Sequence, residues 1–122
     1  MMTTMQPKPS YKRGDVILTL FPNSDLQSAK MRPALIVQAD NLNTGIAQIV
    51  VAMISTNLQR AGHPARLTVL HDTPVGQQSG LLFDSVVMTD NLATVAEAAI
   101  RRTVGSLPMD EVDNALRHTL SL

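Results

Sequence analysis

A polar segment that ends in an arginine stands directly before an apolar stretch of the sequence. Arg32 closes residues 23–32 and is followed by residues 33–39 (PALIVQA). Loops on a rigid scaffold are where binding and catalytic groups concentrate. An arginine there can bind a phosphate bidentately and stabilise charge that develops in phosphoryl transfer, although a solvated surface arginine is the more ordinary interpretation. The other side chains of this segment that could hold a substrate are Ser24, Gln27, Ser28 and Lys30.

A second group of polar side chains follows another apolar run. Ser55, Thr56 and Asn57 come directly after residues 46–54 (IAQIVVAMI), which places them at the far end of an expected central strand. Their hydroxyl and amide groups could bind phosphate or ribose oxygens. They could instead cap and turn the backbone, which is the commoner role of such residues.

Asp90 and Asn91 follow a third apolar run, residues 81–89. They can present an acceptor and an amide edge to a nucleobase, but as isolated residues they indicate a turn that ends the strand. The formal net charge is zero, so a nucleic-acid site would have to come from local clustering of charge. Stacking on rings could contribute little to such a site, because the aromatic residues are only Tyr11, Phe21 and Phe83.

The sequence lacks the residues and motifs of several classes of functional site. There is no cysteine, which excludes a disulfide, a cysteine-ligated zinc and a thiol nucleophile and fits a reducing compartment such as the cytoplasm. No GxSxG, P-loop, GxGxxG or HExxH pattern occurs. The histidines, His63, His71 and His118, lack the spacing of a metal site. We therefore expect neither a metal nor a cofactor.

The elements that must position these residues are mostly strands. Residues 1–10 carry two prolines and no periodic apolar pattern, and they indicate a flexible arm before one domain at residues 11–122. Alternating or continuous apolar runs predict strands at 15–21, 33–39, 46–54, 66–71, 81–89 and 100–104, joined by Gly- and Pro-containing loops. Residues 109–120 predict an amphipathic helix, with acidic residues in its first turn and basic residues in its last.

These elements favour a small antiparallel barrel or sandwich over a parallel βαβ sheet. The runs at 33–39 and 46–54 are continuously apolar, so we expect two neighbouring antiparallel strands, buried on both faces, at the centre of the sheet. No apolar run approaches the ~18 residues of a membrane span, and the N-terminus lacks the apolar core of a signal peptide. Membrane insertion and secretion are therefore not expected. The residues alone lead to a β-barrel with a polar, arginine-bearing rim and to no named activity.

The order of several short motifs resembles the MazF/PemK family of toxins. The chain opens with KRGDV at residues 12–16 and continues with KMRPALIV at 30–37 and VAMIST at 51–56. Residues 80–95, with TDNLATV at 89–95, and VGSL at 104–107 before the final helix complete the similarity. It covers nearly everything from Tyr11 to Leu122 in the family's order, which is more specific than any single motif.

The resemblance implies an SH3-like (CcdB/PemK-like) antiparallel barrel that forms a homodimer. It implies a toxin of a type II toxin–antitoxin system that cleaves single-stranded RNA at short sequences, without a metal, to leave a 2′,3′-cyclic phosphate and a 5′-hydroxyl. It also implies an antitoxin partner that blocks the RNA groove. Arg32 matches the family's catalytic arginine and Ser55 its catalytic threonine, with Thr56 as an adjacent hydroxyl that could substitute. Asn57, Asp90 and Asn91 are expected to bind substrate.

The sequence departs from some family members within the polar segment. Leu26 stands where a histidine is often found, and Gln27 replaces its usual glutamate neighbour, which argues against a histidine-assisted mechanism. Two other functions stay open from the sequence. One is a non-enzymatic, CcdB-like toxin that binds DNA gyrase, and the other is an SH3-like interaction module. Arg32-Pro33 together with Ser55-Thr56 favours the nuclease, and the scarcity of aromatic residues argues against the interaction module.

Overall fold

The computed structural model describes residues 10–122. Of the flexible arm predicted at residues 1–10, residues 1–9 lie outside the described residues. The strands are β1 (Asp15–Pro22), β2 (Ala29–Ile36), β3 (Gln48–Ser55), β4 (Arg66–Val69), β5 (Ser85–Ala96) and β6 (Ile100–Ser106). The helices are α1 (Pro74–Ser79) and α2 (Asp110–Leu120), with short 3-10 turns η1 (Leu58–Arg60) and η2 (Glu97–Ala99).

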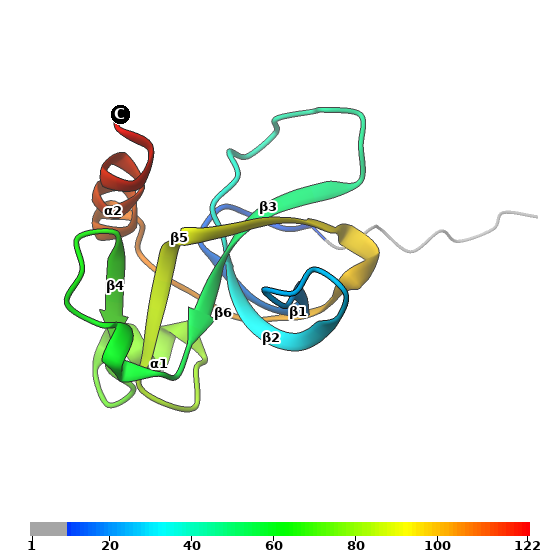
Figure 1. The fold of residues 1–122 in the computed structure, drawn as a ribbon. Coiled ribbons are helices and arrows are strands. Elements are labelled where there is room, and N and C mark those ends of the chain that lie inside the picture. The colour runs from blue at the N-terminus through cyan, green and yellow to red at the C-terminus, as the bar shows by residue number, and fades with distance from the viewer. Residues whose placement is uncertain (1–9) are drawn as a thin grey trace, which may run out of the picture.

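The strands form one six-stranded sheet in the order β4-β5-β3-β2-β1-β6. Every pairing is antiparallel, and the sheet curves strongly on itself, with α2 beside β4 and β5 (Figure 1). The predicted antiparallel, mainly β fold with a C-terminal helix is confirmed. The two apolar runs expected at the centre of the sheet are β2 and β3, which are neighbours there.

Both faces of the central strands are buried, as their continuous apolarity indicates. Successive residues of β2 point into opposite core clusters, Leu35 into one and Ala34 and Ile36 into the other. The helix α2 covers the first cluster with Val112, and Phe21 packs in the second. Leu120 in the last turn of α2 is 51% exposed, whereas Val112 and Ala115 of the same helix are buried.

The largest correction to the predicted strands concerns β5. It begins at Ser85 rather than Leu81 and continues to Ala96 through the residues expected to form a turn. Met53 of β3 pairs with Met88, whereas Ala52 pairs with Leu92, so one step along β3 corresponds to four along β5. Thr89, Asp90 and Asn91 are therefore the extra residues of a bulge, which bends the strand instead of ending it.

Other elements also differ from expectation. The strand predicted at 46–54 begins at Gln48, and Ile46 in the preceding loop is 61% exposed, while the strand predicted at 66–71 ends at Val69. The strand predicted at 33–39 begins at Ala29 and ends at Ile36, because residues 29–32 pair with the end of β1 in a hairpin. The segment around Pro74, Gly76 and Gly80, expected as a loop, contains α1. Within residues 10–122 no helix is long and apolar enough to cross a membrane.

Candidate functional site

A cleft opens where β2 and β3 separate. Their ladder runs from Ile36↔Val51 to Ala34↔Met53 and stops there. The next residue of β2 is Pro33, whose nitrogen has no hydrogen to donate to a ladder. Continuing the register by two residues would put Arg32 opposite Ser55, but by that point β3 pairs only with β5. The two polar side chains singled out by sequence thus lie on opposite strands at the point where the strands diverge.

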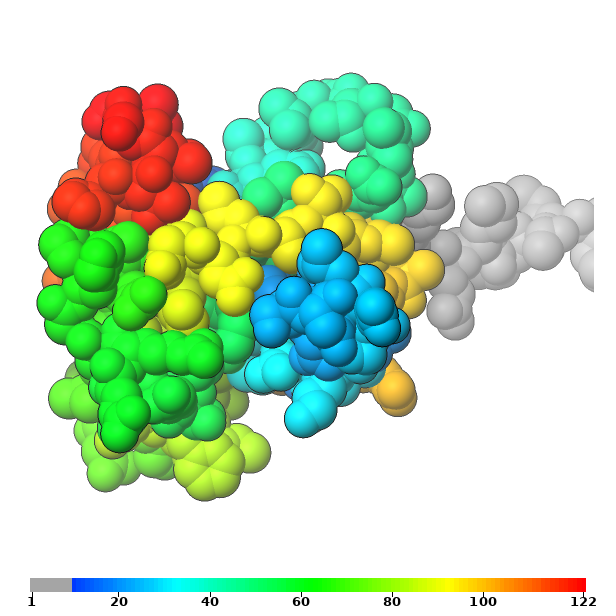
Figure 2. Space-filling view, in the orientation of Figure 1, coloured from blue at the N-terminus to red at the C-terminus, as the bar shows by residue number. Residues whose placement is uncertain are grey.

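The cleft has a volume of about 560 Å³. Four segments line it: the end of β1 together with the loop that follows, β2, β3 together with η1, and the bulge of β5. Figure 2 shows the loop in blue beside the yellow part of β5. The predicted site residues that line it are Ser24, Lys30, Arg32, Ser55 and Asn91, and the residues that sequence reasoning did not assign include Phe21, Asn23, Asp25, Met53 and Arg60.

Arg32 is partly buried, and its hydrogen bonding is incomplete. Its Nη2 donates to Oδ1 of Asn23 at 3.1 Å, which ties the guanidinium to the β1–β2 loop. Its Nε–H is shielded from solvent and has no acceptor within the described residues. A buried donor without a partner costs about 1–3 kcal/mol, and such groups in native proteins call for an explanation. An anion bound in the cleft would supply acceptors to this guanidinium.

The β1–β2 loop is held together by Asp25. Its carboxylate accepts from the backbone N–H of Gln27 at 2.9 Å and of Ser28 at 3.2 Å, and from the Ser28 hydroxyl. The backbone hydrogen bond from Gln27 is the largest cause that lowers the pKa of Asp25. Gln27 and Ser28, predicted to bind substrate, are therefore part of the loop's own hydrogen bonding and do not line the cleft, whereas Ser24 and Lys30 do.

The three polar residues after β3 differ in position. Ser55 ends the strand, is 9% exposed and borders the cleft, and its Oγ accepts from the Asn57 N–H at 3.1 Å. Thr56 is exposed and lies outside the cleft lining. Asn57 caps η1 by accepting from the Gln59 N–H at 3.1 Å. Ser55 and Asn57 thus both bond to the backbone of the turn, as chemistry alone favoured, and of the three residues only Ser55 also lines the cleft.

Asp90 and Asn91 are adjacent in the bulge but face different surroundings. Asn91 lines the cleft, where its Nδ2 donates to Sδ of Met53 at 3.0 Å. Asp90 forms an ion pair with Arg66 at 2.9 Å and does not line the cleft. The hydrogen bond from Arg66 lowers the pKa of the Asp90 carboxyl.

The cleft is locally basic although the chain is neutral. Lys30, Arg32 and Arg60 line it together with a single carboxylate, Asp25. Arg60 belongs to η1, and nothing in its sequence surroundings separates it from an ordinary surface arginine. Its place in the cleft depends on how the β3–β4 loop folds back over β5. The arrangement offers guanidinium and ammonium groups to phosphates, a hydroxyl at Ser55 and an amide at Asn91, which suits an anionic, hydrogen-bonding polymer.

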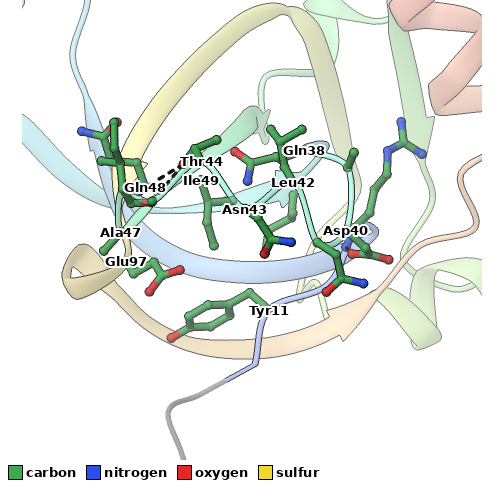
Figure 3. Close-up of a pocket in the computed structure, with 16 residues that line it drawn as sticks. Tyr11, Gln38, Asp40, Leu42, Asn43, Thr44, Ala47, Gln48, Ile49 and Glu97 are labelled. Atoms are coloured by element: carbon green, nitrogen blue, oxygen red, sulfur yellow. Dashed lines mark hydrogen bonds between the residues drawn. The ribbon is translucent and has the colours of Figure 1, made fainter.

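The RGD motif at residues 13–15 has a structural role away from the cleft. Arg13 donates to the Val37 carbonyl at 3.0 Å and forms an ion pair with Asp113 of α2 at 2.7 Å, while its N–H donates to Asp40. These contacts tie the β2–β3 loop and α2 to the start of β1. The cavity of about 420 Å³ under that loop, lined by Tyr11, Asp40 and Glu97 among others, contains none of the predicted site residues (Figure 3).

Comparison with known proteins identifies the family of the chain. Residues 12–120 match the family described as PemK-like, MazF-like toxins of type II toxin–antitoxin systems. Endoribonuclease MazF6 of Mycobacterium tuberculosis is 34% identical over 107 residues, which cover 84% of the chain and 90% of that protein. Endoribonuclease EndoA of Bacillus subtilis is 29% identical over 115 residues, covering 91% of the chain and 95% of the relative.

Solved structures share the fold. A mycobacterial endoribonuclease in complex with its cognate antitoxin superposes with a TM-score of 0.68 at 22% identity, covering 93% of the chain and 97% of the other. MazF of Deinococcus radiodurans gives a TM-score of 0.65 at 19% identity, with 91% and 96% covered. The family match spans nearly the whole described chain, and the chain therefore belongs to the PemK-like, MazF-like toxins of type II toxin–antitoxin systems.

Proposed function

We propose that this toxin is a sequence-specific endoribonuclease that cleaves single-stranded RNA in the cytoplasm. The observation that carries the proposal is Arg32, whose incompletely bonded guanidinium lies with Ser55 in a basic cleft. Relatives at 34% and 29% identity are endoribonucleases, which supports the same activity here. Family membership and these relatives favour this function over a gyrase-binding toxin or an interaction module.

The proposed reaction uses the RNA's own 2′-hydroxyl. Its oxygen attacks the adjacent phosphorus in line, the bond from phosphorus to the 5′ oxygen breaks, and a 2′,3′-cyclic phosphate and a 5′-hydroxyl result. The 2′ oxygen loses a proton and the leaving 5′ oxygen gains one. Arg32 stabilises the pentacoordinate phosphorane, because a guanidinium is a permanent positive charge with several donors and a poor proton carrier. Ser55 holds a phosphate oxygen or the 2′-hydroxyl, and no histidine is among the residues that line the cleft.

The central test of this function is cleavage in the presence of EDTA. Within residues 10–122 no three His, Asp or Glu side chains gather as a metal site would require. We expect single-stranded RNA to be cut in excess EDTA and duplex RNA to be left largely intact. Mapping the new 5′ ends of the products reveals the recognised sequence. Activity that disappears on chelation and returns with a divalent ion would refute the metal-independent mechanism.

The proposed partners follow from the same family. We propose that the toxin works as a homodimer and is held inactive by a cognate antitoxin. A mycobacterial endoribonuclease of the same fold forms a complex with its cognate antitoxin, which supports the second of these partners. A groove shared between two copies would extend the short basic cleft of one chain. A longer groove would suit a substrate of several nucleotides.

The adjacent hydroxyls of Ser55 and Thr56 provide a matched test of the site. We expect Ser55→Ala to slow cleavage about tenfold, the typical cost of one lost hydrogen bond in the transition state. Thr56→Ala should leave the rate near that of the wild type, because Thr56 is exposed and lies outside the cleft lining. Single-turnover cleavage of one RNA by both variants measures the difference. The reverse order of effects would assign the working hydroxyl to Thr56.

A further inference from the structure

Asp90 makes its hydrogen bonds away from the cleft. Both of its carboxylate oxygens accept from Arg66, Oδ2 from Nη2 at 2.9 Å and Oδ1 from Nε at 3.3 Å. The two side chains are 33% and 23% exposed, so the pair is partly shielded from water. Since the pKa of Asp90 is lowered from 3.8, the carboxylate is ionised throughout the neutral range. An ionised carboxylate engaged in this way is a poor proton donor and faces Arg66 instead of a substrate.

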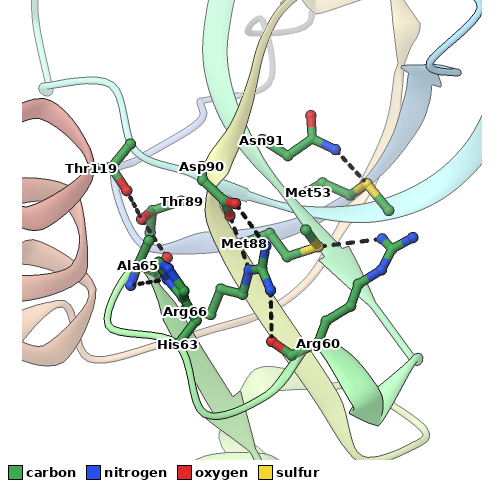
Figure 4. A network of polar contacts seen from close by, with 10 residues as sticks. All are labelled: Met53, Arg60, His63, Ala65, Arg66, Met88, Thr89, Asp90, Asn91 and Thr119. Carbon is green, nitrogen blue, oxygen red and sulfur yellow. Dashed lines mark hydrogen bonds and ion pairs between the residues drawn. The ribbon is translucent and has the colours of Figure 1, made fainter.

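Arg66 also bonds to the loop that carries Arg60. Its Nη1 donates to the Arg60 carbonyl at 3.1 Å, so one guanidinium joins the β5 bulge to the main chain of η1 (Figure 4). The neighbouring bulge residue Thr89 holds the other end of the loop. Its backbone N–H and its hydroxyl both donate to the Ala65 carbonyl, at 3.1 and 2.6 Å. The bulge thus fixes residues 60–65 at both ends.

The side chain of Arg60 returns from this fixed loop to the cleft. Its guanidinium lies on the same side of β5 as Asn91 and Met53, and its Nη1 donates to the Met88 sulfur at 3.4 Å (Figure 4). A thioether is a weak acceptor. Within residues 10–122 no carboxylate lies within 4.0 Å of the Arg60 nitrogens. The positive charge is therefore held in place without being neutralised by a neighbour.

We propose that Arg60 binds a phosphate of the RNA backbone next to the scissile one, and that Asp90 is a positioning residue that holds Arg60 there through Arg66. This inference rests on the proposed ribonuclease function. Asp90 then supports substrate binding only through Arg66 and Arg60, and it has no role at the reacting atoms. Arg60 is a second arginine in addition to Arg32, on a different wall of the cleft, and would set the direction in which the RNA strand crosses.

The first measurement compares Arg60→Ala with the wild type. We expect KM for a random-sequence single-stranded RNA to rise about tenfold, the scale of one hydrogen bond to a charged group, while kcat changes little. Binding of the same pool with 2′-O-methyl sugars, which cannot be cleaved, should weaken equally. The slope of log affinity against log salt should become shallower by about 0.7, as expected for one lost phosphate contact. Arg101→Ala, an exposed arginine on β6 outside the cleft, is the control.

The second measurement is a double-mutant cycle between Asp90 and Arg60. Asp90→Asn alone should raise KM, and in the Arg60→Ala background it should add nothing, because its effect passes through Arg60. Asp90→Glu, which can still pair with Arg66, should restore most of the affinity. Asp72→Asn removes a carboxylate whose side chain is 98% exposed, in the turn before α1, and serves as the matched control. Melting is measured on every variant, and Asp90→Glu supplies the comparison if the asparagine variant unfolds.

The outcomes distinguish a failure of the roles assigned to Arg60 and Asp90 from a failure of the ribonuclease function. If Asp90→Asn lowers kcat by the same factor with and without Arg60, Asp90 acts at the reacting atoms and the positioning role is wrong. If Arg60→Ala binds the 2′-O-methyl RNA as tightly as the wild type, Arg60 is not a phosphate ligand. A wild-type protein that binds this RNA but never cuts the unmodified pool would overturn the ribonuclease function instead, and the binding cycle would still decide how Arg60 and Asp90 are coupled.

Discussion

Arg32→Ala is expected to lower the rate of RNA cleavage by ~10²-fold or more, because it removes a positive donor that acts mainly on the charge of the transition state. The fold should survive the change. Arg32 bonds only to Asn23 among the described side chains, and its Nε–H is already unpaired, so its removal takes away an unfavourable buried donor together with one hydrogen bond. The measurement is single-turnover cleavage by variant and wild type at equal concentration.

Two controls make the Arg32 result interpretable. Melting and sedimentation of the variant should match those of the wild type, since a misfolded protein loses activity trivially. Arg32→Lys keeps the charge but loses the planar fork of donors, so we expect it to recover only part of the rate. A folded Arg32→Ala protein that cuts RNA at nearly the wild-type rate would show that the site assignment is wrong, even if the protein is a ribonuclease.

The strands and the terminal helix were predictable because their apolar pattern follows burial. In β3 the unbroken run after Gln48 is buried on both faces, which is what continuous apolarity in a central strand indicates. The bulge of β5 was not predictable in this way. Thr89, Asp90 and Asn91 are turn-forming residues by type, and the pairing of β5 with β3 on both sides of them overrides that local preference. Pairing between segments that are distant in the chain cannot be predicted from the residue types of one segment alone.

The candidate site was predictable in part, and the parts differ in their physical basis. Arg32 directly precedes Pro33, and Ser55 directly follows the apolar run at 46–54. The register of the β2–β3 ladder explains why the two residues lie on opposite sides of the cleft. Gln27, Ser28 and Asn57 were chosen for their chemistry, but their backbone groups take part in the loops' own hydrogen bonds. Arg60 was missed because only the folded β3–β4 loop brings it beside the cleft.

The helix α1 shows a different failure, since its signals were present and were interpreted as a loop. Thr73 caps the helix by accepting from the Gly76 N–H, Pro74 occupies its first turn, and Gly80 ends it with φ of 71°. The helix is six residues long and has no apolar periodicity, so pattern analysis overlooks it. It matters for stability because its C-terminal glycine lies against the backbone of β6.

Gly80→Ala is therefore expected to destabilise the fold strongly although it lies outside the cleft. A Cβ built at Gly80 would be 2.0 Å from the Val104 carbonyl oxygen. Val104 is the bulged residue of β6, but Thr103 and Gly105 on either side of it both pair with β1, so its carbonyl cannot move aside cheaply. The left-handed φ adds strain on the order of 1 kcal/mol for a residue with a side chain. We expect the clash to raise the loss to ~3 kcal/mol or more, which lowers the melting temperature by about 10 °C in a domain of this size.

Gly62→Ala isolates the contribution of the clash. Gly62 also has a left-handed φ, 87°, but a Cβ there would meet nothing within 4 Å. This control should lose only the conformational strain, so its melting temperature should fall by a few degrees at most. Equal losses in the two variants would show that backbone strain alone is responsible and that the contact between α1 and β6 is not tight. The expected large difference would instead show that the close contact between α1 and β6, which lies outside the cleft lining, is required for the stability of the fold.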